Sequence, residues 1–506
     1  MRPPANSAAS PAQSPATRPD GPAGMTLAQL RRAIASRTVS ATDVVRAMLD
    51  RIEAHNLALN AFREVYADDA LRRAGEIDAR LSRGESGGAL AGVPIAIKDN
   101  IACTLGTTAA GSRFLEHYRS PFDATAVSRL LGEGAVILGR TNCDEFAMGS
   151  STEHCACGPV RNPHAPDRVP GGSSGGSASA VAAWLCPAAL GSDTGGSVRQ
   201  PAACCGVVGV KPSYGRVSRW GLVAFASSLD QIGPITHCVE DAAILLDVIS
   251  GRDPLDATCA DLAPTRAVAA LAQPLDGPWR VGVARQHRSP ENHPAITGAL
   301  DRAIECCRRA GASIVEIDLP LTDHGIATYY ILAAAEASSN LARYDGIRYG
   351  RRAAPQPGEA LTDLYERSRS EGFGPEVRRR IMLGTYVLSA GYADQFYLRA
   401  LKARRLIRDE FSRAFHACDV ILGPTAPSPA WRLGEKSDPL SMYLGDVYTV
   451  NANIAGLAAL SIPAGWADVD GSRLPIGVQL QAPAMEEERL LHAAGVLEAL
   501  LGDRSR

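Results

Sequence analysis

Two glycine- and serine-rich segments, residues 171–177 (GGSSGGS) and 191–199 (GSDTGGSVR), constrain the fold of this 506-residue chain more than any other feature. Between them lie a run of small apolar residues at 177–185 and a short apolar stretch at 188–190. We expect the run to form a closely packed helix and the stretch to lead, buried, into the second loop. Such alternation predicts an α/β layered core.

The same alternation extends beyond these loops. Residues 126–133 predict a helix, 135–138 a strand, and 91–100 (AGVPIAIKDN) a buried strand that ends in polar groups. Lys98 therefore lies at a strand end, where α/β proteins place chemistry. A charged helical region without a strand signal follows at about 330–418. Further strand patterns lie at residues 280–284, 312–317, 420–422, 459–462 and 476–480.

The charge balance limits the possible partners. The chain has 52 Lys and Arg against 54 Asp and Glu, so it has no net field that would attract nucleic acid or an anionic membrane. Any RNA contact would have to be local or supplied by a partner. No run of eighteen apolar residues indicates a membrane span.

Residues 1–24 contain six prolines and no apolar core of a signal peptide, so we expect a disordered N-terminal extension. A transit peptide is the alternative, because Arg2 and Arg18 precede the first acidic residue, Asp20. The prolines argue against the amphipathic helix that such peptides form.

None of the twelve cysteines forms a C-x-x-C pair, so we interpret them as reduced, mostly buried thiols of a cytoplasmic protein. Cys155 and Cys157, close to His154, are the best candidates for a metal site. The sequence offers no fourth ligand near these three residues, so we expect no metal ion there.

Ser173 and Ser197, 24 residues apart, each lie among glycines. Glycine allows a ligand to approach main-chain N–H groups closely, as acyl transfer requires. A phosphate-binding loop is excluded because no lysine follows Gly176. The G-x-S-x-G elbow of hydrolases needs a preceding strand, and the three prolines in residues 162–170 exclude one. Serines that simply fill tight turns remain an alternative.

A serine nucleophile needs a base, and no later histidine has a partner pattern that marks it as one. Lys98 follows the apolar residues Ile95 and Ile97, and such surroundings favour a neutral amine. A paired or snorkelling lysine at a strand end is the alternative.

Two motifs resemble those of the amidase signature family: residues 169–211 resemble its serine signature and residues 92–100 its lysine motif. That family uses a Ser-Ser-Lys triad, and the spacings of 75 residues from Lys98 to Ser173 and 24 to Ser197 match its pattern. The resemblance implies a large mixed central sheet covered by helices on both faces. It also implies one domain over residues 25–506, with the Ser-Ser-Lys core at about 60–250.

By position, the resemblance implies that Ser197 is the nucleophile and that Lys98 is the base. Ser173, on a cis peptide bond, would relay the proton between them. The oxyanion would lie on main-chain N–H groups of Thr194, Gly195, Gly196 and Ser197.

Within the family, the chain is most similar to the glutaminase branch that serves tRNA-dependent amidotransferases. The segments that carry this likeness are residues 144–153, 213–230, 336–349, 371–374 and 379–384. The likeness implies that Arg379 binds the α-carboxylate of glutamine, Asp446 its ammonium, and that Tyr330 helps to close the pocket. From the residues alone, Arg379 could equally be a solvated member of an arginine triplet, and Asp446 a turn residue.

The implied reaction is hydrolysis of glutamine through a glutamyl-serine intermediate. The ammonia would convert Glu-tRNA(Gln) to Gln-tRNA(Gln), or Asp-tRNA(Asn) to Asn-tRNA(Asn). GatB-like and GatC-like subunits would complete a heterotrimer, and the subunit that binds the mischarged tRNA would use ATP and Mg²⁺. This chain itself would need no cofactor. The alternatives are a stand-alone amidase for small amides and an inactive scaffold, and the intact triad argues against the scaffold.

Overall fold

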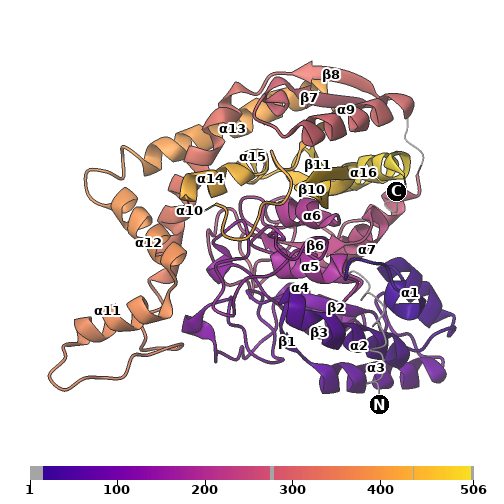
Figure 1. Ribbon diagram of the computed structural model, residues 1–506, viewed down its shortest axis with the longest axis horizontal. Coiled ribbons are helices and arrows are strands. Elements are labelled where there is room, and N and C mark those ends of the chain that lie inside the picture. The colour runs from indigo at the N-terminus through magenta and orange to yellow at the C-terminus, as the bar shows by residue number, and fades with distance from the viewer. Residues whose placement is uncertain (1–14, 274–278, 437, 503–506) are drawn as a thin grey trace, which may run out of the picture.

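The computed structural model describes residues 15–273, 279–436 and 438–502, and its centre is one mixed sheet of eleven strands (Figure 1). The pairs β2–β3, β2–β4, β7–β8 and β7–β9 are parallel, and the other neighbouring pairs are antiparallel. The predicted α/β fold with a large mixed sheet is thereby confirmed. The strands are, in order across the sheet, β1 (Phe62–Val65), β3 (Val136–Thr141), β2 (Pro94–Lys98), β4 (Ala188–Asp193), β6 (Gln231–Thr236), β5 (Val208–Lys211), β10 (Ala458–Val469), β11 (Ser472–Ala482), β9 (Val420–Pro424), β7 (Arg280–Ala284) and β8 (Ser313–Ile317).

Helices cover both faces of this sheet. α5 and α6 pack against each other and against central strands, while α7 packs against α4, α8 and α16. Within the described ranges, no helix is both long and apolar enough to cross a membrane. The α-helices are α1 (Leu27–Ala35), α2 (Ala41–Leu59), α3 (Ala67–Ser82), α4 (Thr125–Gly132), α5 (Gly175–Ala182), α6 (Arg199–Cys205), α7 (Val239–Ile249), α8 (Ala267–Leu271), α9 (Pro294–Arg309), α10 (Gly325–Leu341), α11 (Leu361–Gly372), α12 (Pro375–Leu388), α13 (Tyr397–Ala417), α14 (Pro439–Tyr443), α15 (Val450–Ala455) and α16 (Glu487–Leu501).

The sheet order brings the two glycine-serine segments to Lys98. The first segment leads directly into α5, and the second joins β4 to α6. β4 runs parallel to β2, with Ile97 beside Leu190 in the register. The carboxyl ends of parallel strands meet at one edge of a sheet, so the loop after β4 lies next to Lys98, the last residue of β2.

Residues 15–24 belong to the segment expected to be disordered, but the structure places them against the body. Gly21–Gly24 form a 3-10 helix, and Ala23 within it is buried. Arg18 donates to the carbonyl of Gly24 at 2.8 Å and lies 5.1 Å from the ring centre of Trp184. The expectation of disorder is therefore corrected for residues 15–24, and its remainder, residues 1–14, lies outside the described residues.

Residues 325–417 form the helical region that the sequence predicts, with α10, α11, α12 and α13 and no strand between them. In Figure 1 α11 and α12 lie on the side of the molecule opposite α1 and α16. A second apolar cluster, distinct from the core around the sheet, joins this region to the body. Its members include Phe114, Phe146, Tyr329, Tyr330 and Phe373.

Candidate active site

Lys98 is fully buried and surrounded by hydroxyl groups. Its Nζ lies 2.7 Å from Oγ of Ser173 and 2.9 Å from Oγ of both Ser174 and Ser192. A charged amine has three N–H donors, so these three hydroxyls can satisfy all of them. A neutral amine at the same place can instead accept a proton from one hydroxyl. The structure thus brings Lys98 and Ser173 together as predicted.

The surroundings favour this neutral amine. Burial lowers the pKa of Lys98 to about 8, although buried groups such as Cys143, Asp144 and Asp193 act in the opposite direction. At pH 7 roughly a tenth of the amines would be neutral at such a pKa. Lys98 is therefore suited to act as a base near neutral pH.

The segment before α5 fixes Ser173. The peptide bond between Gly172 and Ser173 is cis, as the resemblance implies. The amide of Gly172 donates to Oε1 of Gln200 at 2.9 Å, and the carbonyl of Ser173 accepts from the amide of Asp144 at 3.3 Å. The backbone on both sides of this bond is thus tied to neighbouring segments.

Ser197 lies just before α6 and is almost buried. Its carbonyl accepts from the amide of Ser174 at 3.1 Å, which ties the second loop to the first. Its Oγ makes no hydrogen bond with any described residue. The structure thus contains the Lys98–Ser173 contact but not a hydroxyl contact between Ser173 and Ser197.

The loop that carries Ser197 is held by a buried ion pair. Asp193 accepts from the amides of Gly196 at 2.9 Å and Val198 at 3.1 Å, and pairs with Arg199 at 3.0 Å. Burial opposes the charge of Asp193, but Arg199 outweighs it and lowers the pKa of Asp193 to about 2. The loop conformation therefore depends on a charged carboxylate.

One of the four expected oxyanion donors is already used. The amide of Gly196 is bound to Asp193 and is not free in this arrangement. The carbonyl of Gly195 accepts from Oγ1 of Thr449 at 2.7 Å, and Oγ1 of Thr194 donates to Asp230 at 2.7 Å. The carbonyl of Gly195 and the side chain of Thr194 thus hold the loop, and neither contact uses a main-chain amide. The amides of Thr194, Gly195 and Ser197 therefore remain the predicted hydrogen-bond donors to the oxyanion.

Asp446 lies beside Ser150 with one carboxylate oxygen free. Its Oδ2 accepts from Oγ of Ser150 at 2.5 Å, whereas its buried Oδ1 has no hydrogen-bond partner among the described residues. Burial raises the pKa of Asp446 to about 7, and Ser150 and Arg380 act in the opposite direction. An unpaired buried carboxylate oxygen is suited to bind a cation.

The structure places Arg380, rather than Arg379, beside Tyr330. The side chain of Arg379 is half exposed and pairs with the buried carboxylate of Glu376. Arg380 is buried, donates Nε to Oε1 of Glu376 at 2.8 Å and lies 5.1 Å from the ring centre of Tyr330. Its two terminal nitrogens make no hydrogen bond with a described residue. Consecutive helical residues point about 100° apart, so α12 turns Arg380 toward Tyr330 and Arg379 in another direction.

Tyr330 itself is buried. Its ring stacks on Tyr443 with centroids 3.7 Å apart, and the hydroxyl of Tyr443 donates to Glu376 at 3.0 Å. We call Tyr330, Arg380, Tyr443 and Asp446 the Arg380 cluster, and Lys98, Ser173, Ser174, Ser192 and Ser197 the Ser-Lys core.

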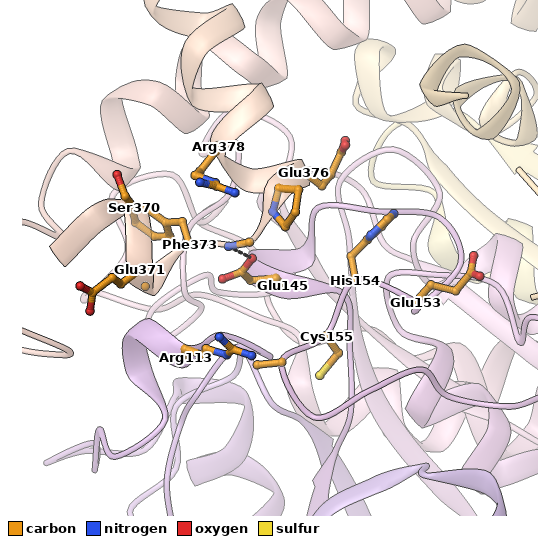
Figure 2. A pocket seen from close by; sticks show the side chains of 14 residues that line it. Arg113, Glu145, Glu153, His154, Cys155, Ser370, Glu371, Phe373, Glu376 and Arg378 are labelled. Atoms are coloured by element: carbon orange, nitrogen blue, oxygen red, sulfur yellow. Dashed lines mark hydrogen bonds between the residues drawn. The ribbon is translucent and has the colours of Figure 1, made fainter. Parts of the chain in front are cut away.

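A cavity of about 460 Å³ opens beside the Arg380 cluster (Figure 2). Glu376 lines it and also binds Arg380, whereas no member of the Ser-Lys core lines it. Glu145 in its wall accepts from Oγ of Ser112 at 2.5 Å and from the amide of Gly374 at 2.8 Å. Burial raises the pKa of Glu145 to about 7. Glu145 thus ties the segment after β3 to the start of α12.

The geometry does not support a metal site at His154, Cys155 and Cys157. His154 and Cys155 line the same cavity, but Sγ of Cys155 donates to Oδ1 of Asn142 at 2.5 Å. In the part of the chain that the structure describes, no group of three His, Cys, Asp or Glu side chains could hold a metal ion.

The sequence did not single out Ser174, Ser192, Asp193 or Arg199, although all lie in or beside the two glycine-serine segments. The sequence shows these four residues as polar positions within segments that are otherwise expected to be buried. Without the sheet register, such positions cannot be distinguished from the polar residues of ordinary turns.

Residues 43–491 match the family model described as Amidase. Among curated relatives, the A subunit of the glutamyl-tRNA(Gln) amidotransferase of Deinococcus radiodurans is 54% identical over 476 residues, covering 94% of this chain and 97% of that protein. The protein of the same name from Azotobacter vinelandii is 52% identical over 472 residues, covering 93% and 96%.

Solved structures agree with these matches. The A subunit of the glutamyl-tRNA(Gln) amidotransferase of Thermotoga maritima is 39% identical, with a TM-score of 0.75 and coverage of 94% of this chain and 93% of that one. The peptide amidase of Stenotrophomonas maltophilia is 32% identical, with a TM-score of 0.79 and coverage of 94% and 96%. The chain therefore belongs to the amidase family.

Proposed function

We propose that the chain is the glutaminase subunit of a tRNA-dependent amidotransferase. The observation that carries this proposal is a buried arginine, Arg380, and a buried carboxylate, Asp446, that both keep free hydrogen-bonding atoms. Glutamine carries an α-carboxylate and an α-ammonium, so its pocket needs a cation with a planar fork and a carboxylate. The names of the relatives from Deinococcus and Azotobacter support the same conclusion.

In the proposed reaction, Oγ of Ser197 attacks the side-chain amide carbon of glutamine. Its proton passes through Oγ of Ser173 to the neutral Nζ of Lys98. Lys98 then returns a proton to the departing nitrogen, so ammonia leaves and a glutamyl ester remains on Ser197. Water hydrolyses this ester, releases glutamate and restores the Ser197 hydroxyl.

The negative charge that develops on the amide oxygen needs donors in fixed positions. We assign this role to the amides of Thr194, Gly195 and Ser197, and we assign Asp193 and its amide contacts to holding the loop. Losing one such donor typically costs about 100- to 1,000-fold in rate. The buried Asp193–Arg199 pair supports this role, because it fixes the loop before substrate arrives.

For glutamine, we assign the α-carboxylate to the terminal nitrogens of Arg380 and the α-ammonium to Oδ1 of Asp446. Tyr330 would line the pocket between them. The free oxygen of Asp446 and the unbonded nitrogens of Arg380 support this orientation.

The acceptor chemistry belongs to partner subunits. We propose a heterotrimer in which a partner binds the mischarged tRNA, activates it with ATP and Mg²⁺ and receives the ammonia. A stand-alone amidase for small amides is the second candidate, favoured by the likeness to the peptide amidase.

Coexpression with the two candidate partner subunits, followed by a glutaminase assay, separates these functions. We expect copurification and glutamine hydrolysis that rises when mischarged tRNA and ATP are present. Rapid hydrolysis of varied small amides by the single chain, without association, would overturn the proposal in favour of the stand-alone amidase.

A further inference from the structure

The outer face of α12 and the start of α13 expose large apolar side chains. Met382 is the most exposed of them, at 73%. Contiguous exposed apolar residues of this size mark interaction sites on soluble proteins. We call this surface the α12–α13 corner, and it consists of Met382, Leu383, Tyr386, Leu388, Tyr392, Leu398 and Leu401.

An aromatic cluster lies between the two helices of the corner. The ring centre of Tyr392 lies 4.6 Å from that of Tyr386, and Phe396 lies 6.0 Å from Tyr386 and 6.1 Å from Tyr392. These rings join the end of α12 to the start of α13. Figure 1 shows α12 and the loop that follows it at the margin of the molecule, away from the sheet. Tyrosine is enriched among the residues that dominate binding energy at interfaces.

The opposite face of α12 is already occupied. Gly384 packs so closely on α10 that a Cβ there would lie 1.9 Å from the carbonyl oxygen of Ala334. Glu376 and Arg380 also point inward, toward Tyr443 and Tyr330. The apolar outer face is therefore not part of this chain's own core.

The corner carries cations that have no acidic partner. Residues 377–408 contain eight Arg and Lys, but five of them already bind side chains of this chain: Arg379 and Arg380 bind Glu376, Arg404 binds Ser228, and Arg405 and Arg408 pair with Asp409. Arg399 and Lys402, next to Leu398 and Leu401 in sequence, form no ion pair with a described residue. Free cations beside an apolar patch favour a partner that is both apolar and acidic.

We propose that the α12–α13 corner binds an acidic amphipathic helix of a partner subunit. The proposal rests on the proposed function, which requires such subunits. An amphipathic helix would place its apolar face on Met382, Tyr386 and Leu401 and its carboxylates near Arg399 and Lys402. RNA could use the cations and rings, but it would leave the exposed Met and Leu side chains without an apolar partner.

The test uses the full chain and its two partner subunits. The double variant Met382→Glu/Leu401→Glu places negative charge on the corner, and Leu57→Glu on α2 is the matched control because Leu57 is 98% exposed. We expect the double variant to raise the Kd for the partner subunits by about 10-fold or more, and the control by less than about 2-fold. Thermal unfolding of each free chain checks that the fold is retained.

Two further measurements identify the occupant. Lys402→Glu should weaken binding and reduce its dependence on salt concentration, because one ion pair is lost. A photo-crosslinker at Tyr386 should attach to an acidic helical segment of a partner subunit, and one at Leu57 should not.

The outcomes separate this inference from the proposed function. If the wild-type chain does not bind the partner subunits, both proposals are overturned. If it binds them and the double variant binds equally well, the corner is not the docking site, although the glutaminase role stands. Crosslinking of Tyr386 to tRNA would likewise overturn the proposal that an acidic helix binds this corner.

Discussion

The Ser-Lys core and the Arg380 cluster differ in how completely their polar groups are paired. In the core, Nζ of Lys98 contacts three hydroxyls, and the neighbouring Asp193 binds two amides and Arg199. In the Arg380 cluster, by contrast, Oδ1 of Asp446 and the terminal nitrogens of Arg380 have no hydrogen-bond partner among the described residues, although the guanidinium lies over the rings of Tyr330 and Tyr443. Apart from the free hydroxyl of Ser197, the polar groups of the first region are paired without substrate, and those of the second are not.

This difference suggests separate roles for the two regions: the Ser-Lys core for the chemical steps and the Arg380 cluster for substrate binding. Leaving a buried polar group unpaired costs about 1–3 kcal/mol, and a ligand that supplies the missing partner recovers this free energy. Preorganised groups, in turn, need no rearrangement when charge develops during the reaction. We therefore expect changes in the core to lower kcat and changes in the Arg380 cluster to raise KM.

Ser197→Ala gives the strongest test of the core. We expect glutamine-dependent ammonia release by the assembled complex to fall by about a millionfold, because the attacking oxygen is absent. Glutamine binding, measured by calorimetry, should stay within about 2-fold because the Arg380 cluster is intact. Substantial remaining activity would refute the assignment of the nucleophile.

Lys98→Ala should cost about 10⁴-fold in kcat, because it removes the base. The wild-type enzyme supplies a second check, since burial lowers the pKa of Lys98 to about 8. The neutral amine is the active form, so kcat at saturating glutamine should be low in acid and rise as the pH passes about 8. A Lys98→Ala variant whose residual kcat retained this rise would show that another group is the base.

Ser173→Ala and Ser174→Ala compare two neighbouring hydroxyls that both contact Lys98, at 2.7 and 2.9 Å. If Ser173 alone relays the proton, its loss should lower kcat by about 10²- to 10³-fold. Loss of Ser174 should cost about 10-fold or less, because it only helps to hold the amine. If both variants lowered kcat equally, Ser173 could not be assigned as the proton relay and Ser174 as a residue that only holds the amine.

The sequence predicts the core well because its signals are local. The apolar run of β2 ends at Lys98, and glycine flanks both Ser173 and Ser197. By contrast, the positions of Ser174 and Ser192 around Nζ depend on the pairing of β2 with β4, which only the fold provides.

The composition of the Arg380 cluster could not be predicted from the sequence alone, because it depends on side-chain direction. Residues 378–380 are three consecutive arginines, and the sequence does not say which one faces inward. The close packing of Gly384 on α10 fixes the rotation of α12 and thereby buries Arg380. The free oxygen of Asp446 could not be predicted either, because it depends on which neighbours surround the carboxylate in the fold.

Arg380→Ala and Arg379→Ala test directly which of the two arginines binds the carboxylate of glutamine. We expect Arg380→Ala to raise the KM for glutamine by about 10- to 100-fold with a smaller effect on kcat, because a charge-assisted contact to the carboxylate is lost. Arg379→Ala should change KM by about 2-fold or less, since its side chain is half exposed. The reverse ranking would restore the sequence-based assignment.

The smallest effect concerns the ionisation of Asp446, whose pKa burial raises to about 7. Only the charged carboxylate attracts the ammonium of glutamine, so a proton competes with substrate at this residue. The KM should therefore rise as the pH falls through about 7, by up to about 10-fold for each pH unit below it. Asp446→Asn should raise KM by about 10-fold at pH 8 and remove this pH dependence, because the amide does not ionise. If KM kept the same slope in the variant, the titrating group would lie elsewhere, and the free oxygen of Asp446 would have no role in binding glutamine.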